Sequence, residues 1–230
     1  LFALADEMRQ SILYNRRMGQ WCNILRGRRM LTLFYEPSTR TRLSFEFAMS
    51  HLGGQVFSTE NAKDFSSAIK GESLEDTIRV ICGYGIDVIV LRHHEEGSAL
   101  RAAKVSTVPI INAGDGQGQH PTQSLLDLYT IWQRFGHIQE LSVAMVGDLE
   151  KGRTARSLAY LLGKFPDITI YFVSPDSAKM KQDIKDYLRA HKVKFEEIDD
   201  IHKVAEKVDV IYQTRTQTER GSSSDVANPE

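Results

Sequence analysis

Short apolar runs alternate with amphipathic segments along nearly the whole of this 230-residue chain. The runs have the length of buried strands, and the segments between them repeat apolar residues with the period of a helix. Strands that alternate with helices pair in parallel, because each helix returns the chain to the start of the next strand. The pattern therefore predicts an α/β fold of two doubly wound domains, whose parallel sheets are covered by helices on both faces.

The predicted elements fall into two series that are separated by a long helix. In the first series, strands are predicted over residues 30–35, 55–58, 87–91 and 108–112, and helices over 1–14, 41–52, 73–84, 97–104 and 121–136. In the second series, strands at 141–146, 168–173, 193–196 and 208–212 alternate with helices at 154–164, 178–191 and 201–206. We place the domain boundary after the long helix, which predicts domains at 1–136 and 137–230.

The charge balance excludes some classes of partner. The chain has 29 basic and 30 acidic residues and is 41% hydrophobic, which is typical of a soluble globular protein and does not favour a nucleic acid or a membrane as a partner. Cys22 and Cys82 are far apart in apolar contexts, so we expect buried free thiols rather than a disulfide. Free thiols favour a reducing compartment such as the cytoplasm.

The stretch from Phe34 to Arg42 joins an apolar strand directly to the start of a helix. Such a junction points free backbone N–H groups and the positive end of a helix dipole at one place. Three hydroxyls and a guanidinium lie there, on Ser38, Thr39, Thr41 and Arg40. Small hydroxyls let a phosphate approach the backbone, and arginine can hold two of its oxygens. The stretch predicts a phosphate site, and an ordinary helix capped by Ser or Thr is the alternative interpretation.

Ligands of open parallel sheets collect at the carboxyl ends of the strands. Four of the five strand ends considered carry an arginine, and the remaining one carries a histidine and a glutamine; the residues are Arg40, Arg92, Arg153 and Arg215, with Gln217 close by, and His120 with Gln123. A single arginine in a loop is usually a solvated surface charge. Four at strand ends indicate a ligand with several negative charges.

His120 is predicted to begin the long helix, immediately before Pro121. The dipole at a helix start lowers the pKa of an imidazole and favours its neutral form. A neutral imidazole is suited to donate a hydrogen bond to a polarised carbonyl oxygen. A purely structural role at the start of the helix is the alternative.

Three patterns resemble cofactor or metal sites and are rejected. Gly114, Gly116 and Gly118 do not have the spacing of a dinucleotide fingerprint. The stretch 147–154 is close to a nucleotide-binding P-loop, but Arg153 stands where lysine belongs, and Asp148 and Glu150 would place carboxylates beside the phosphates. The histidines and glutamates at 93–96 lack the spacing of metal ligands. We therefore predict no cofactor and no metal.

Six short motifs follow one another in a recognisable order. They are Phe-Tyr-Glu-Pro-Ser-Thr-Arg-Thr-Arg at 34–42, Lys-Gly-Glu-Ser at 70–73, Asn-Ala-Gly-Asp-Gly at 112–116, His-Pro-Thr-Gln at 120–123, Val-Gly-Asp-Leu at 146–149 with Gly-Arg-Thr at 152–154, and Tyr-Gln-Thr-Arg at 212–215. Together they resemble the transcarbamoylase family, in its aspartate branch. The resemblance implies transfer of the carbamoyl group of carbamoyl phosphate to the amino group of L-aspartate, giving N-carbamoyl-L-aspartate and phosphate in pyrimidine synthesis.

The resemblance also implies a role for each matching residue of the first domain, which would be the carbamoyl-phosphate domain. The phosphate would be bound by Ser38, Thr39, Arg40 and Thr41. The carbamoyl end would be bound by Arg92, His120 and Gln123. Its carbonyl oxygen would be polarised by Thr41, Arg92 and His120, which is an oxyanion arrangement for a tetrahedral intermediate.

The second domain would bind aspartate, through Arg153 and Arg215 with help from Gln217. Ser66 would contact carbamoyl phosphate and Lys70 would contact aspartate, and both would reach the active site of a neighbouring subunit, which implies a homotrimer with shared sites. Lys70 joins Arg40, Thr41, Arg92 and His120 in the expected catalytic set. The sequence assigns no regulatory partner chain.

Two other functions are left open by these residues. Ornithine transcarbamoylases share the phosphate motif, but Arg153 and Arg215 suit a dicarboxylate, and Thr122 stands where those enzymes usually carry cysteine. Family members continue beyond the last residues of this chain, so we expect the aspartate domain to be incomplete at its C-terminus; a non-catalytic chain that binds carbamoyl phosphate is the second alternative. A weaker likeness to the plant branch makes the plastid the alternative to the cytoplasm.

Overall fold

The structure is a computed structural model that describes residues 1–15, 21–59, 71–116 and 118–214. It contains two compact units, the first over Leu1–Tyr129 and the second beginning at Thr130. This division falls within helix α6 (Pro121–Phe135). The boundary predicted after residue 136 stays a prediction.

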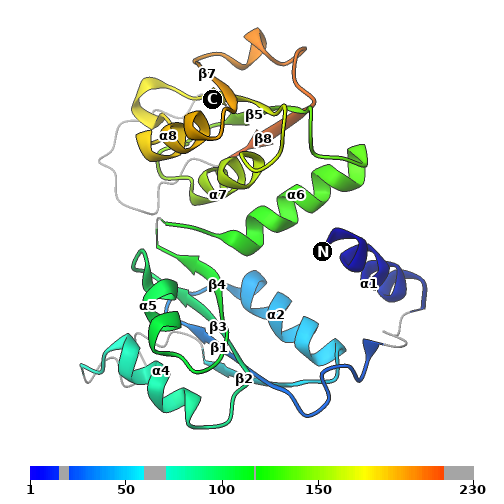
Figure 1. The fold of residues 1–230 in the computed structure, drawn as a ribbon, viewed down its shortest axis with the longest axis vertical. Coiled ribbons are helices and arrows are strands. Elements are labelled where there is room, and N and C mark those ends of the chain that lie inside the picture. Colours follow the sequence, from blue (N-terminus) through cyan, green and yellow to red (C-terminus); the bar gives the residue numbers. More distant parts are fainter. Residues whose placement is uncertain (16–20, 60–70, 117, 215–230) are drawn as a thin grey trace, which may run out of the picture. The chain divides into compact units, whose positions relative to one another are not determined.

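The first unit is built on a parallel sheet of four strands in the order β2-β1-β3-β4 (Figure 1). The strands are β1 (Arg29–Phe34), β2 (Gln55–Thr59), β3 (Val88–His93) and β4 (Ile110–Asp115). The helices are α1 (Phe2–Asn15), α2 (Thr39–His51), α4 (Leu74–Cys82), α5 (Ser98–Val105) and the first part of α6, up to Tyr129. The chain leaves β1 towards β2 and later returns to the other side of β1 as β3, so the strand order reverses between β1 and β3.

Helices cover both faces of this sheet. Alternate side chains of a strand point to opposite faces. One face buries Leu33 and Leu91 against Ile78 of α4 and Ala102 of α5, and the other buries residues of β1 and β3 against Met49 of α2. Figure 1 shows α2 on one side of the sheet and α4 and α5 on the other.

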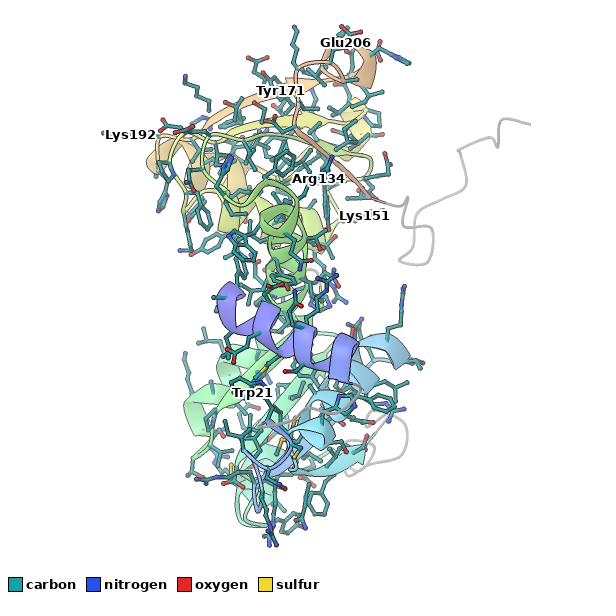
Figure 2. All side chains as sticks on the ribbon, turned by 90° about the vertical axis from the view of Figure 1, so that its right-hand side faces the viewer. Trp21, Arg134, Lys151, Tyr171, Lys192 and Glu206 are labelled. Atoms are coloured by element: carbon teal, nitrogen blue, oxygen red, sulfur yellow. The ribbon has the colours of Figure 1, made fainter. Side chains whose placement is uncertain are left out.

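The second unit repeats this plan with a parallel sheet in the order β7-β6-β5-β8. Its strands are β5 (Ser142–Val146), β6 (Thr169–Val173), β7 (Lys194–Ile198) and β8 (Val210–Gln213), and its helices are α7 (Arg153–Leu162) and α8 (Gln182–Ala190) with short 3-10 turns at Asp176–Ala178 and Ile201–Lys203. One face packs Ala144 and Val173 against Val204, with Tyr171 (labelled in Figure 2) at its margin. Here the strand order reverses between β5 and β8.

The predicted α/β class with two doubly wound parallel sheets is confirmed. Ser73 caps helix α4, because the N–H of Asp76 donates to Ser73 Oγ, and Ser73 Oγ in turn donates to the Asp76 carboxylate. Both cysteines lie in the described part and are free thiols, but the prediction that both are buried is wrong, since Cys22 is exposed.

Two helices of the second series were predicted too long. The helix expected over 178–191 begins only at Gln182. The carbonyl of Ala178 accepts the N–H of Leu149 from the loop after β5, so it is used outside the helix. The helix expected over 201–206 is a 3-10 turn of three residues, because six residues supply too few hydrogen bonds to offset helix nucleation.

Candidate functional site

The predicted phosphate site lies where β1 passes into α2. Ser38 occupies the N-cap position, but within the described residues its side chain makes no capping hydrogen bond, with φ −161° and ψ 78°. Ser38 is therefore the N-cap residue by position, but its hydroxyl does not cap a helix N–H as the alternative interpretation expected. The first intrahelical bond runs from the N–H of Arg42 to the carbonyl of Ser38. The N–H groups of Thr39, Arg40 and Thr41 precede it and have no intrahelical acceptor.

A polar network attaches α2 to the sheet behind this helix start. The buried hydroxyl of Thr32 on β1 donates to Glu46 at 2.9 Å, and Ser58 of β2 donates to the same carboxylate at 2.6 Å. Arg42 forms an ion pair with Glu46 at 3.1 Å. Burial alone would raise the pKa of Glu46, but these hydrogen bonds and the charge of Arg42 hold that pKa below its ordinary value. Arg42 is therefore a structural residue, unlike its neighbour Arg40, whose side chain is exposed.

Arg92 lies near the carboxyl end of β3 and is 8% exposed. Its Nη1 donates to the carbonyl of Ala113 at 3.2 Å, and its Nη2 lies 3.5 Å from Glu36 Oε2. The register of β3 against β4 shifts at this point, because Leu91 pairs with Asn112 while His93 pairs with Asp115. The extra residue forms a bulge that includes Gly114 at φ 119°. Bulges of this kind change the direction of a neighbouring side chain.

His120 lies at the end of the loop that follows β4 and is buried, at 6% exposure. Its carbonyl accepts the N–H groups of Gln123 and Ser124, so it has a structural role at the start of α6. Its Nδ1 lies 3.5 Å from Thr122 Oγ1. The amide of Gln123, which was also predicted to bind the carbamoyl group, donates to Asp127 at 2.9 Å.

Adjacent parallel strands bring these residues to one edge of the sheet. Phe34 pairs with Arg92, and the N–H of Tyr35 donates to the carbonyl of Arg92 at 2.9 Å. The start of α2 thus follows β1 directly beside Arg92, at the place where the strand order reverses. His120 follows β4, the next strand. Reversal points are where open α/β sheets bind their ligands.

His93, next to Arg92, has a structural role. It is buried between the rings of Tyr35 at 4.6 Å and His94 at 4.3 Å, and its Nδ1 accepts the N–H of Glu95. Burial, followed by the nearby His94, lowers the pKa of His93 to about 4. His93 is therefore neutral near pH 7 and carries its proton on Nε2.

In the second unit, Arg153 is the first residue of α7 and is 6% exposed. The loop before it is held by the Asp148 carboxylate, which accepts the N–H of Lys151 at 3.0 Å; Lys151 is labelled in Figure 2. A carboxylate that already occupies the loop's backbone supports the rejection of a nucleotide phosphate site here. Thr214 at the end of β8 is tied to β5 by two bonds to the carbonyl of Val146. Because α7 follows β5, Arg153 lies at the point where the strand order reverses between β5 and β8.

Four predicted site residues, Ser66, Lys70, Arg215 and Gln217, lie outside the described residues. Asp115 belongs to the 112–116 motif but received no role from the sequence, and its carboxylate organises the loop before His120. An acid between two glycines at the end of an apolar strand, in Gly114-Asp115-Gly116, is the sequence signal that points to it. Within the described ranges, no group of three or more His, Cys, Asp or Glu side chains could hold a metal ion. In the same ranges no helix is long and apolar enough to cross a membrane.

Two family models match the chain, one for each unit. The model of the carbamoyl-P binding domain of aspartate/ornithine carbamoyltransferase matches residues 1–133, and that of its Asp/Orn binding domain matches residues 139–227. The chain is 59% identical over 220 residues to a chloroplastic aspartate carbamoyltransferase of Arabidopsis thaliana, which covers 96% of this chain and 56% of the relative. It is 53% identical to the aspartate carbamoyltransferase catalytic subunit of Methanocaldococcus jannaschii, and this match covers 86% of this chain and 64% of the relative.

Solved structures agree with these matches. The catalytic subunit of M. jannaschii aspartate transcarbamoylase superposes with a TM-score of 0.82 at 51% identity, over 94% of this chain and 69% of that chain. Aspartate transcarbamoylase of Trypanosoma cruzi, in complex with N-(phosphonacetyl)-L-aspartic acid, superposes with a TM-score of 0.86 at 40% identity, over 95% of this chain and 68% of that one. The chain thus spans little more than half the length of the plant relative, and it belongs to the aspartate/ornithine carbamoyltransferase family.

Proposed function

We propose that this chain transfers the carbamoyl group of carbamoyl phosphate to the amino group of L-aspartate, giving N-carbamoyl-L-aspartate and phosphate in pyrimidine synthesis. The observation that carries the proposal is the first reversal point. There an exposed helix start with three hydroxyls and Arg40 directly follows the strand beside the buried guanidinium of Arg92. That combination suits a ligand with a dianionic end and a polar carbonyl end.

In the proposed reaction, the N–H groups and hydroxyls at the start of α2 hold the phosphate group together with Arg40. Thr41, Arg92 and His120 donate to the carbonyl oxygen of the carbamoyl group. The lone pair of the aspartate amine attacks the carbonyl carbon, and the oxygen gains negative charge, which these donors stabilise. The bond from carbon to the bridging phosphate oxygen then breaks, and the leaving phosphate accepts the proton that the amine loses.

Aspartate is preferred to ornithine because of the cation at the second reversal point. Arg153, with Arg215 and Gln217, would hold the two carboxylates of aspartate, and the same arginines would repel the cationic side chain of ornithine. The relatives support this choice, since those of A. thaliana and M. jannaschii are named aspartate carbamoyltransferases. A T. cruzi relative at 39% identity has been solved with both carbamoyl phosphate and aspartate.

The proposal is tested by measuring carbamoyl-aspartate formation by the 230-residue chain, with ornithine as the control acceptor. We expect turnover with aspartate, none with ornithine, and loss of turnover in Arg40→Ala. Arg28→Ala is the matched control, because Arg28 is an exposed arginine paired with Asp87 at the amino end of the sheet. Turnover with ornithine would overturn the assignment of aspartate as the acceptor substrate. Binding of carbamoyl phosphate without turnover would favour the non-catalytic alternative.

The assembly is proposed to be a homotrimer in which Ser66 and Lys70 serve the site of a neighbouring subunit. Its support is the resemblance of the 70–73 motif to the family. Light scattering should give three times the chain mass of 26.0 kDa. Mixing the inactive variants Arg40→Ala and Lys70→Ala, followed by subunit exchange, should restore part of the activity. A mixture that stays inactive would argue against shared sites.

For the compartment, the names of the relatives favour the plastid over the cytoplasm. Relatives from Arabidopsis thaliana and Pisum sativum that are 59% and 62% identical to this chain are named chloroplastic. Fractionation of the source cells, followed by detection with an antibody raised against this chain, would decide between the two compartments.

A further inference from the structure

Asp115, the last residue of β4, fastens two loops at the carboxyl edge of the first sheet. It is 7% exposed. Its Oδ1 accepts the N–H of Gln119 at 2.8 Å, and its Oδ2 accepts the N–H of Gly97 at 3.1 Å. Its own carbonyl accepts the N–H of Gly118 at 2.9 Å. One side chain therefore ties the loop before His120 to the start of α5.

The first of these bonds controls how the chain enters His120. Gln119 immediately precedes His120, and the N–H of Asp115 donates back to the carbonyl of Gln119 at 3.3 Å. On the other side, Pro121 restricts the backbone of the residue before it. His120 is thus held between a residue fixed by Asp115 and the first turn of α6. A shift of Gln119 would move the imidazole.

Asp115 also lies between Ala113 and Gly116, the two residues that bond to Arg92 and to its neighbour His93. Arg92 donates to the carbonyl of Ala113, two residues before Asp115, and the N–H of Gly116 donates to the carbonyl of His93 at 2.8 Å. A Cβ on Gly116 would clash with the carbonyl oxygen of His94, so the two loops are in direct contact. The backbone around Asp115 therefore contacts both β3 at Arg92 and His93 and the loop that leads to His120.

We propose that Asp115 is a positioning residue of the carbamoyl-transfer site, whose carboxylate fixes the imidazole of His120 relative to the guanidinium of Arg92. The proposal rests on the proposed function for its chemistry. Both carboxylate oxygens accept backbone N–H groups, so the residue acts through His120 rather than on the substrate. Hydrogen bonds to a charged acceptor are the stronger kind, and the negative charge beside the N-terminus of α5 is itself favourable.

The kinetic test uses Asp115→Asn in the full chain. Asparagine has the same shape but offers one acceptor oxygen, and its NH₂ group would face a second N–H. We expect kcat to fall roughly 100-fold, as for a small displacement of a catalytic group, while the KM for carbamoyl phosphate changes by less than about threefold. Asp87→Asn is the matched control, because Asp87 also accepts a backbone N–H, that of Arg29 at 2.8 Å, at the amino end of the sheet. It should leave kcat unchanged.

A double-mutant cycle separates positioning from general stability. If Asp115 acts through His120, Asp115→Asn should reduce kcat by less than about threefold in a His120→Gln background. A full further loss in that background, or an unchanged kcat in Asp115→Asn alone, would overturn the proposal. If Asp115→Asn does not fold, Asp115→Glu keeps the charge beside α5 and moves the acceptors by one methylene. The same pattern is then expected of it.

Nuclear magnetic resonance of the seven histidines gives a result that does not depend on turnover. The ring signals of His120 are identified by their loss in His120→Gln. They should move in Asp115→Asn and stay in place in Asp87→Asn. Unmoved signals would contradict the positioning role even in an active enzyme. If the signals move but the unaltered chain does not transfer carbamoyl groups, the proposed function is rejected, whereas the effect of Asp115 on the position of His120 stands.

Discussion

The helices that follow the two reversal points, α2 after β1 and α7 after β5, are attached to their sheets in different ways. Helix α7 buries seven of its residues, Arg153 among them. Helix α2 buries Met49 within its described residues and is tied to the sheet by the Thr32, Glu46 and Ser58 network. The first unit thus presents a helix start with hydroxyls, whereas the second presents a buried cation at the first residue of a largely buried helix. The two starts suit different ligands, a bulky dianion and a small carboxylate.

The largest effect should come from removing the arginine at each reversal point. Arg92→Ala should lower kcat by about 100- to 1,000-fold, because it removes one donor to the developing oxyanion. Arg153→Ala should instead raise the KM for aspartate, since it removes a contact made before the reaction as well as during it. Steady-state kinetics over both substrates provide the measurement. A matching loss of kcat in the two variants would break the division of roles.

A smaller effect should appear as acid sensitivity of the first unit. The folded pKa of His93 is about 4, below the ordinary value of 6.5, so the unfolded state binds the proton more readily between these values. The contribution of His93 is complete above pH 6.5 and is lost as the pH falls towards 4, which amounts to about 2 kcal/mol at pH 5. The carboxylates with lowered pKa values, such as Glu75 at about 2, lose their contribution only at lower pH.

This pH dependence can be assigned to one unit by tryptophan fluorescence. Trp21 (Figure 2) lies in the first unit and Trp132 in the second, so two single-tryptophan variants can follow denaturant unfolding of each. The free energy of unfolding should fall between pH 7 and pH 5 at Trp21, and His93→Gln should remove most of that fall. An equal fall with His93→Gln would assign the acid sensitivity to another group.

The smallest effect concerns the polar attachment of α2. Thr32→Val keeps the shape of the side chain but removes the hydroxyl that donates to Glu46, and it should cost about 1 kcal/mol of unfolding free energy. Because α2 carries the groups that bind phosphate in the proposed site, the KM for carbamoyl phosphate should also rise in this variant. The control is Ala159→Ser in the buried face of α7, which should affect stability alone. A KM that does not change in Thr32→Val would show that the network only stabilises the fold.

The sequence allowed the alternation of elements and the residues at the strand ends to be predicted, because both depend on local patterns. Strand ends of a parallel sheet share one edge, so Arg92 and the start of α2 could be grouped from the order of the elements alone. Long-range bonds could not be predicted in this way. The carbonyl of Ala178 accepts from Leu149, which shortens α8, and the carboxylate of Asp115 joins Gly97 to Gln119 across loops that lie far apart in sequence.

The central claim is that the first reversal point binds the phosphate part and the second the aspartate part of the reacting pair. Calorimetry with two ligands tests it most directly: N-(phosphonacetyl)-L-aspartate carries both parts, and phosphonoacetamide carries the part that resembles carbamoyl phosphate, without the aspartate. Arg40→Ala should weaken the binding of both ligands. Arg153→Ala should weaken only the binding of N-(phosphonacetyl)-L-aspartate, by roughly tenfold or more. Equal weakening of phosphonoacetamide in Arg153→Ala, or unchanged binding in Arg40→Ala, would contradict the account.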